Sequence, residues 1–218
     1  MAENTDTPVR AAWALQDPLL TAYYDAEWGM PVFDDDGVFE RLSLEAFQSG
    51  LSWLTVLRKR VAFREAFDGF SIEQVSRYSD GDVTRLLADA RIIRNERKII
   101  ATIANARAAL RFREEHGTGL AEFVWSFRPE RSPVPARDAD VPTLSSESTA
   151  LARALKRRGF AFVGPTTVYA LMTAIGIVDA HVVTSHRRGC SELWSPDGTW
   201  AGADLPFQAP VTAPRIPG

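Results

Sequence analysis

The sequence has very little cysteine and no long apolar run, and both absences narrow the possibilities. Its single cysteine, Cys190, cannot form a disulfide within the chain, which favours a reducing compartment. No apolar stretch approaches the roughly 20 residues that a membrane-spanning helix requires. The first residues also lack the basic and apolar regions of a signal peptide. We therefore expect a cytoplasmic protein that does not enter a membrane.

A positive net charge is also missing, although most proteins that bind duplex DNA strongly carry one. The formal net charge is −3, from 25 basic and 28 acidic residues. Acidic residues gather at 34–36, whereas basic residues gather at 58–60, 91–98 and 156–158. A basic patch can face a nucleic acid while another face stays acidic. Each run is equally typical of a solvated helix face, so charge alone leaves both interpretations open.

Strand patterns are scarce, whereas apolar residues recur at helical spacing along most of the 218 residues. Hydrophobic residues make up 45% of the chain, which is long enough to bury a large core. We expect an all-α fold in one domain over residues 10–195, with a Pro-rich loop at 129–142. The prolines after Trp194 predict an extended or disordered tail at 196–218. Helices are predicted over residues 52–66, 145–158 and 165–176. Four further helices are predicted to begin after residue 36, after residue 71 and at residue 79, and to end near residue 117.

The most informative stretch begins at Tyr23 and ends at Trp53, where aromatic residues and a carboxylate share a mostly apolar setting. Aromatic faces attract cations, and a carboxylate can accept hydrogen bonds from a ligand and balance its charge. Glu45 lies on or near the apolar face of its predicted helix, where carboxylates are rare unless paired or functional. This pattern suits a flat, electron-poor ligand. Core packing is the alternative for any tryptophan, and we favour it for Trp125 and Trp194.

Several long motifs occur in a fixed order, and together they resemble 3-methyladenine DNA glycosylase I. The motifs are Trp13–Pro18, Tyr23–Gly29, Leu44–Trp53, Phe123–Phe127 and Lys156–Thr167. The resemblance extends from about Trp13 to His181, and it implies a compact helical glycosylase fold with a helix-hairpin-helix element near residues 79–116. It also implies a catalytic role for Glu45. The base-binding residues that it implies are Trp13, Tyr23, Trp28, Glu45 and Trp53.

The resemblance implies a monofunctional DNA glycosylase that excises 3-methyladenine from double-stranded alkylated DNA. Such an enzyme takes the base out of the stack. Stacking of the cationic base on Trp53 would contribute roughly 0.5–2 kcal/mol, and Glu45 can accept a hydrogen bond from the exocyclic amine. Breakage of the N-glycosidic bond passes through an oxocarbenium-like transition state. Because no lysine lies in a nucleophilic motif, we expect the enzyme to release free 3-methyladenine without cutting the strand. We also expect it to act as a monomer.

Two other classes of function remain open. One is a damage-binding protein of the same fold with weak or lost catalysis, and the other is a helical protein with no nucleic-acid role. The presence of Glu45 within the aromatic set favours the enzyme over both alternatives.

The segment from Leu86 to Ile99 predicts a helix end, a short turn and the start of a long helix. The resemblance implies that backbone N–H groups at this helix start bind a DNA phosphate. The family usually has glycine at the positions of Arg91 and Glu96, where it lets the backbone approach a phosphate closely. Glu96 would repel the phosphate, and an ordinary antiparallel helix pair is the alternative. The DNA-binding residues that we predict are Arg91, Arg94, Arg97 and Lys98.

The family usually carries one zinc ion, held by Cys and His residues near both ends of the chain. The corresponding positions here are Ala11, Tyr24, His181 and Ser185. Structural zinc takes four nitrogen or sulfur ligands, and of these residues only His181 is a good one. A replacement set of His181, His186 and Cys190 has irregular spacing and no partner from the N-terminal side. We therefore predict that the chain has no metal site and no other cofactor.

Overall fold

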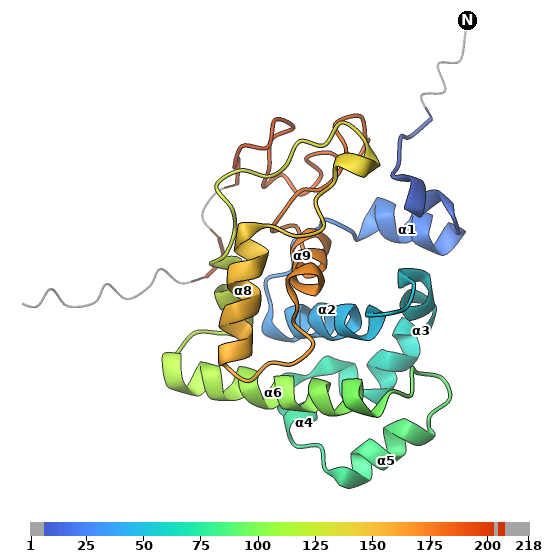
Figure 1. The fold of residues 1–218 in the computed structure, drawn as a ribbon, viewed down its shortest axis with the longest axis vertical. Helices are drawn as coiled ribbons and strands as arrows, with labels where there is room; N and C mark the ends of the chain where they lie inside the picture. The colour runs from blue at the N-terminus through green and yellow to red at the C-terminus, as the bar shows by residue number, and fades with distance from the viewer. Residues whose placement is uncertain (1–6, 203–204, 208–218) are drawn as a thin grey trace, which may run out of the picture.

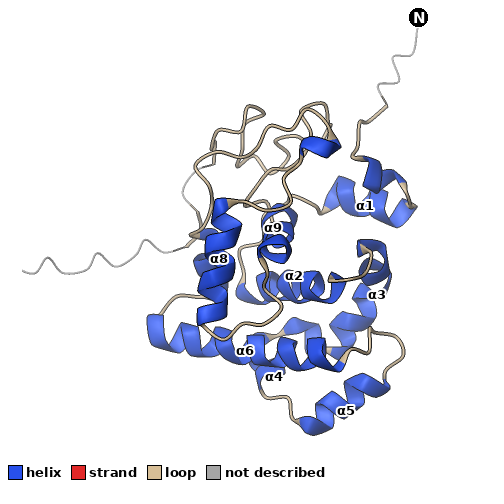
Figure 2. Cartoon of the chain, in the orientation of Figure 1, coloured by secondary structure: helices blue, strands red, loops and turns tan. Residues whose placement is uncertain are grey.

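The computed structural model describes residues 7–202 and 205–207, and the regular secondary structure of this part of the chain consists of helices joined by loops (Figures 1 and 2). It contains no β-strand beyond two isolated bridges, which confirms the predicted all-α class. None of its helices combines the length and apolarity needed to cross a membrane. The α-helices are α1 (Pro18–Ala26), α2 (Asp35–Gln48), α3 (Trp53–Ala66), α4 (Ile72–Ser76), α5 (Asp80–Ala88), α6 (Glu96–His116), α7 (Leu120–Trp125), α8 (Ser146–Arg157) and α9 (Pro165–Ala174). Short 3-10 helices span Ala12–Leu15, Asp68–Phe70 and Asp138–Asp140.

Polar side chains fix where the helices nearest the aromatic stretch begin. At the start of α2, Asp34 Oδ1 accepts a hydrogen bond from the Gly37 backbone N–H at 2.6 Å. At the start of α3, Ser52 Oγ accepts one from the Thr55 backbone N–H at 3.2 Å. These bonds satisfy N–H groups that the first turn of a helix cannot pair internally. The cap on α3 makes Trp53 the first residue of that helix.

The central helix is α2, which packs against α3, α6, α7 and α9. Phe39 and Phe47 on this helix are fully buried, and its polar residues Ser43 and Glu45 are buried as well. A helix that is buried on most of its surface lies inside the core rather than at its edge. In Figure 1, α1 and α5 lie toward opposite ends of the molecule with α2 between them. This position in the core brings Glu45 into an apolar environment.

The two helices predicted near residues 79–116 are present as α5 and α6. A reciprocal pair of hydrogen bonds between Ser79 and Asp82 caps α5, and Asn95 Oδ1 accepts the Lys98 backbone N–H at the start of α6. The helices pack against each other and are joined by residues 89–95. The long helix ends at Gly117, whose φ of 65° is typical of a helix C-terminus.

The start of the predicted tail, residues 196–202, packs on the helical body without helical structure. Trp194 and Trp200 form an isolated antiparallel bridge, with ring centroids 5.1 Å apart. The Arg128 guanidinium lies 3.9 Å from the Trp200 ring centroid. Aromatic and cation–π contacts of this kind hold a Pro-rich segment in place. Residues 203–204 and 208–218 lie outside the described part of the chain.

Candidate functional site

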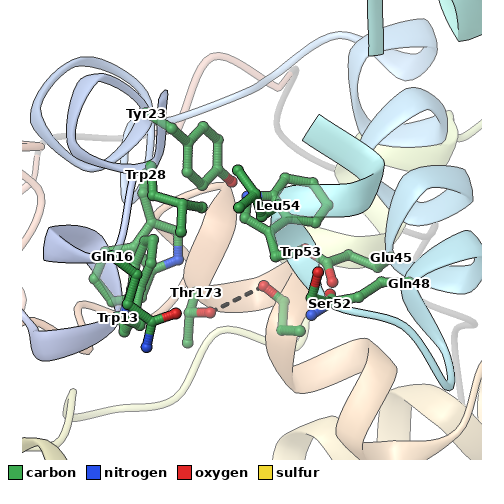
Figure 3. A pocket seen from close by; sticks show the side chains of 12 residues that line it. Trp13, Gln16, Tyr23, Trp28, Glu45, Gln48, Ser52, Trp53, Leu54 and Thr173 are labelled. Atoms are coloured by element: carbon green, nitrogen blue, oxygen red, sulfur yellow. Dashed lines mark hydrogen bonds between the residues drawn. The ribbon is translucent and has the colours of Figure 1, made fainter. Parts of the chain in front are cut away.

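A cavity of about 370 Å³ opens between the Ala12–Leu15 turn, α1, the end of α2, the start of α3, and α9 (Figure 3). All five residues predicted to bind a base line it. The complete lining is Trp13, Gln16, Leu20, Tyr23, Trp28, Glu45, Gln48, Ser52, Trp53, Leu54, Ala170 and Thr173. The size of the cavity is in the range of sites that enclose small ligands.

Aromatic rings form two facing sides of the cavity. Figure 3 shows Trp13, Tyr23 and Trp28 on one side, and Trp53 with Glu45 on the other. The Trp13 and Trp28 rings meet edge to face, with centroids 5.4 Å apart. The Tyr23 and Trp53 rings lie 5.3 Å apart at an angle of 50°. Such an arrangement gives a flat ligand several ring faces and edges to contact.

A tight turn between α2 and α3 brings the carboxyl group and the tryptophan to the same cavity. Gly50 in this turn has a φ of +79°, a conformation that residues with a Cβ atom rarely adopt. Glu45 lies in the last turn of α2, and Trp53 opens α3. The short connection therefore explains why two residues eight positions apart line one cavity.

The Glu45 carboxyl group is buried and has no hydrogen-bond or ion-pair partner among the described residues. Only 7% of the residue surface is exposed. Burial raises the pKa of Glu45 to about 8, and the positive charge of Arg41 opposes this rise. Burying a carboxylate without a partner is costly. A cationic ligand that donates hydrogen bonds would supply the missing partner, which makes Glu45 the strongest functional residue of the cavity.

Two neighbours of Glu45 also have unusual environments. Tyr23 is 4% exposed, and burial together with the charge of Glu45 raises its pKa, so its hydroxyl group stays protonated. Trp53 Nε1 is buried without a hydrogen-bond partner in the described part of the chain. The aromatic stretch therefore retains hydrogen-bonding capacity that core packing does not use. By contrast, Trp125 and Trp194 are each 1% exposed, and their Nε1 atoms donate to backbone carbonyls, which confirms the prediction that they are core residues.

Several polar residues that line the cavity were not predicted from the sequence. Gln16 lies in the first motif, and Gln48 and Ser52 lie in the motif that contains Glu45 and Trp53. Their position within these motifs was a usable signal. Thr173 on α9 has no such signal, because its sequence pattern is that of a core helix. In the structure its hydroxyl group donates to the Ala170 carbonyl at 2.9 Å.

The predicted DNA-binding residues of the hairpin have different environments. Arg94 and Arg97 are exposed beside the start of α6. Lys98 is 7% exposed, and its Nζ donates to the carbonyls of Phe47 at 2.8 Å and Ser49 at 2.6 Å. These contacts occupy the Lys98 ammonium group, so the structure does not support the predicted contact of this side chain with DNA. Its ammonium group instead binds the C-terminal carbonyls of α2, where a positive charge is stabilising, and burial lowers its pKa.

Arg91 is exposed, but two carboxylates already engage its charge. Its guanidinium lies 2.6 Å from Glu65 and 2.8 Å from Asp89. The carbonyls of Ala90 and Arg91 accept hydrogen bonds from Lys59 Nζ. These contacts fix the turn between α5 and α6. Because two carboxylates offset the charge of Arg91, this residue attracts a phosphate less strongly than Arg94 and Arg97 do.

The four positions at which the resemblance predicts zinc ligands converge in space. Tyr24 Oη and Ser185 Oγ are hydrogen-bonded at 2.7 Å, and the Tyr24 and His181 rings meet edge to face at 5.2 Å. Ala11 packs in one apolar cluster with Tyr24. Together these residues offer one imidazole, two hydroxyl groups and a methyl group. This donor set does not fit a tetrahedral zinc site.

His181 keeps the surroundings of a metal-binding imidazole without the other ligands. Its Nδ1 lies 2.7 Å from Asp179 Oδ1, and its Nε2 is buried without a hydrogen-bond partner among the described residues. Metal-binding histidines commonly have such a carboxylate partner. His186 and Cys190 do not complete a site with it, because the described residues contain no group of three or more His, Cys, Asp or Glu placed to hold a metal ion.

Comparisons with known proteins identify one family. A family model described as methyladenine glycosylase matches residues 13–188. DNA-3-methyladenine glycosylase 1 of Escherichia coli (strain K12) is 47% identical over 176 residues, which cover 80% of this chain and 94% of that protein. DNA-3-methyladenine glycosylase of Haemophilus influenzae is 40% identical over 79% of this chain and 94% of the relative. A crystal structure of 3-methyladenine DNA glycosylase I superimposes with a TM-score of 0.76 at 45% identity, covering 80% and 96% of the two chains. A Staphylococcus aureus structure that describes 3-methyladenine recognition gives a TM-score of 0.75 at 33% identity, covering 79% and 92%.

Proposed function

Because the chain belongs to the methyladenine glycosylase family, we propose that it is a DNA glycosylase that removes 3-methyladenine from alkylated DNA. The observation that carries the proposal is the unpartnered Glu45 carboxyl group in a cavity lined by aromatic rings. A neutral adenine gains little from a buried carboxylate. A base that carries a positive charge and an exocyclic amine gains both charge pairing and a hydrogen bond.

Recognition requires the base to leave the DNA stack and enter the cavity. The cationic ring then contacts Trp53 on one side and the aromatic rings of Trp13, Tyr23 and Trp28 on the other. Each good cation–π contact contributes roughly 0.5–2 kcal/mol. Glu45 accepts a hydrogen bond from the exocyclic amine, and its negative charge pairs with the ring. Binding of the cation also favours the ionised form of this carboxyl group, because opposite charges stabilise each other at short range.

The chemical step uses charge that the substrate already carries. The bond between the base nitrogen and the sugar carbon breaks, and the base takes the bonding electrons and leaves as neutral 3-methyladenine. A water oxygen then bonds to the oxocarbenium-like carbon and loses a proton, which leaves an abasic sugar. The Glu45 carboxylate stabilises the positive charge on the base before the bond breaks and the charge on the sugar as it develops.

The cavity offers no amine for a second reaction. No lysine lines it, and the buried ammonium group of Lys98 is bound to two carbonyls at the end of α2. A Schiff base needs a free amine. We therefore expect base hydrolysis only, with the DNA backbone left intact.

DNA binding in this proposal uses the α5–α6 hairpin. The start of α6 presents backbone N–H groups at the positive end of a 21-residue helix, which is a favourable place for a phosphate. Arg94 and Arg97 add exposed positive charge beside it. The proposed substrate is duplex DNA, bound by a monomer in the cytoplasm.

The same proposal includes a fold that holds no zinc. The Tyr24–Ser185 hydrogen bond joins the two segments that the metal would join. Arg188 ties the C-terminal loops, because its guanidinium donates to the carbonyls of Asp179 and His181 at 2.9 and 3.0 Å. Replacing Ala11 with Cys, Tyr24 with His and Ser185 with Cys should install zinc binding, because His181 already has its carboxylate partner. Absence of zinc from that triple variant would argue against the assignment of these positions.

The test of the function is the fate of methylated duplex DNA. The protein should release free 3-methyladenine, detected by chromatography, and leave abasic sites that break only on later alkaline treatment. A damage-binding protein of the same fold without catalysis is the alternative that this test excludes. It would bind methylated DNA and release no base, and that outcome would overturn the proposed activity.

A further inference from the structure

A network of five charged side chains lies beside the cavity and joins α1, α2 and α3. The Arg60 guanidinium holds Glu27 through two bonds of 2.6 and 2.7 Å. The Arg64 guanidinium holds Glu40 at 2.8 Å. Arg41, on α2, is the fifth member. We call this set, Glu27, Glu40, Arg41, Arg60 and Arg64, the arginine network.

Arg41 is the least well paired member of the arginine network. It lies 3.3 Å from Glu27 and 3.5 Å from Glu40, and both carboxylates make shorter contacts to another arginine. Its side chain is only 16% exposed. Its Nη1 atom is buried and has no hydrogen-bond partner in the described residues. A guanidinium group in this state keeps much of its positive potential, because burial leaves little solvent to screen it.

The positive potential of Arg41 acts on Glu45, the carboxyl group of the cavity. Arg41 precedes Glu45 by four residues on α2, so both side chains lie on the same side of the helix. Burial raises the pKa of Glu45, and the charge of Arg41 is the influence that opposes it. The other elements around Glu45 offer Tyr23 from α1, the uncharged Trp53 from α3 and Thr173 from α9. Lys98 from α6 directs its ammonium group to the carbonyls beyond Glu45.

We propose that Arg41 is a positioning residue that keeps the Glu45 carboxyl group ionised when the damaged base is bound. The arginine network contains three positive and two negative groups, so an ionised Glu45 makes the whole assembly neutral. A protonated Glu45 would leave a net positive charge beside a pocket for a cation. Glu27 and Glu40 limit the charge of Arg41 so that it supports Glu45 without repelling the base. The proposal rests on the proposed glycosylase function.

The test is the pH dependence of single-turnover base release from methylated DNA. In Arg41→Met, the acidic limb of the profile should move to higher pH, because the positive charge that stabilises the ionised form of Glu45 is removed. At a pH on that limb the rate should fall about tenfold for each unit of the move, and it should recover at higher pH. In Glu27→Gln, Arg41 loses a competing carboxylate, so the limb should move to lower pH.

Arg64→Met is the matched control, because Arg64 belongs to the same network but has a side chain 42% exposed and, among the described residues, pairs with Glu40 alone. Its limb should move less than that of Arg41→Met, because solvent screens the charge of an exposed side chain. Shifts of opposite sign in Arg41→Met and Glu27→Gln are not expected from a structural defect, which would lower the rate at every pH. A limb that stays in place in both variants would overturn the proposal.

A second measurement separates this proposal from the glycosylase function. The pH titration of the Glu45 carboxyl carbon can be followed by ¹³C NMR, with the signal identified by its loss in Glu45→Gln. The midpoint should be higher in Arg41→Met than in the parent, whether or not the protein releases base. An equal midpoint would overturn the role of Arg41 even if the parent is fully active.

Discussion

Glu45→Gln should make the protein more stable at neutral pH. The glutamine side chain has nearly the same shape as glutamic acid and cannot ionise. In the parent, the unfolded chain releases the Glu45 proton near the ordinary value of 4.5, whereas burial raises the pKa in the folded protein to about 8. Between these values the folded state binds more protons than the unfolded state. The free energy of unfolding therefore falls as the pH rises through this window.

The size of the effect follows from the two pKa values. Each unit of difference corresponds to about 1.4 kcal/mol. Between pH 4.5 and pH 7 the parent loses about 3 kcal/mol through this group, of which only about 0.4 kcal/mol is lost by pH 5. Glu45→Gln avoids this loss. For a domain of this size, about 3 kcal/mol at pH 7 corresponds to a rise of about 6–12 °C in melting temperature.

Urea unfolding of the parent and of Glu45→Gln, measured at pH 5, 6, 7 and 8, tests this reasoning. The advantage of the variant should grow with pH and level off near pH 8. Glu65→Gln is a suitable control, because Glu65 has a side chain 57% exposed and should show no such trend. A constant difference between Glu45→Gln and the parent across the pH range would refute the claim that burial of an unpartnered carboxyl group strains this site.

Three other predictions concern the pocket, the DNA contact and the metal. Free 3-methyladenine should quench tryptophan fluorescence, and Trp53→Ala should weaken its binding while Trp125→Phe should not; equal losses would return Trp53 to the core. Arg94→Glu should weaken binding to all DNA sequences and reduce the salt dependence by about one phosphate contact. Lys98→Met should leave the salt dependence unchanged and lower the melting temperature; the reverse pattern would show that Lys98 contacts DNA. The purified protein should contain negligible zinc by elemental analysis and keep its melting temperature in EDTA; one zinc per chain would contradict this.

The base pocket could be predicted from the sequence because its signal is local. Glu45 and Trp53 lie in one short motif on either side of a turn, and helical spacing places the carboxylate on an apolar face. The aromatic residues of α1 lie in a second motif, and only the resemblance joined the two motifs into one site. The structure adds the burial of Glu45, which depends on α9 and on the central position of α2.

Other features could not be predicted because long-range contacts decide them. Lys98 stands among basic residues that are exposed, and only the end of α2, some 50 residues earlier, buries its side chain. The prolines after Trp194 indicate a tail, but Trp200 and Arg128 hold its first part on the helical body. The pairing of Arg41 likewise depends on three helices that meet only in the fold.

The central claim is that Glu45 recognises a cationic base and assists its departure. The most direct test compares the single-turnover release of 3-methyladenine by the parent and by Glu45→Gln at DNA concentrations that saturate both proteins. The parent should release the base and leave the strand intact, and Glu45→Gln should be slower by about 100-fold or more although it binds DNA and is better folded. Equal rates for the two proteins would contradict the account.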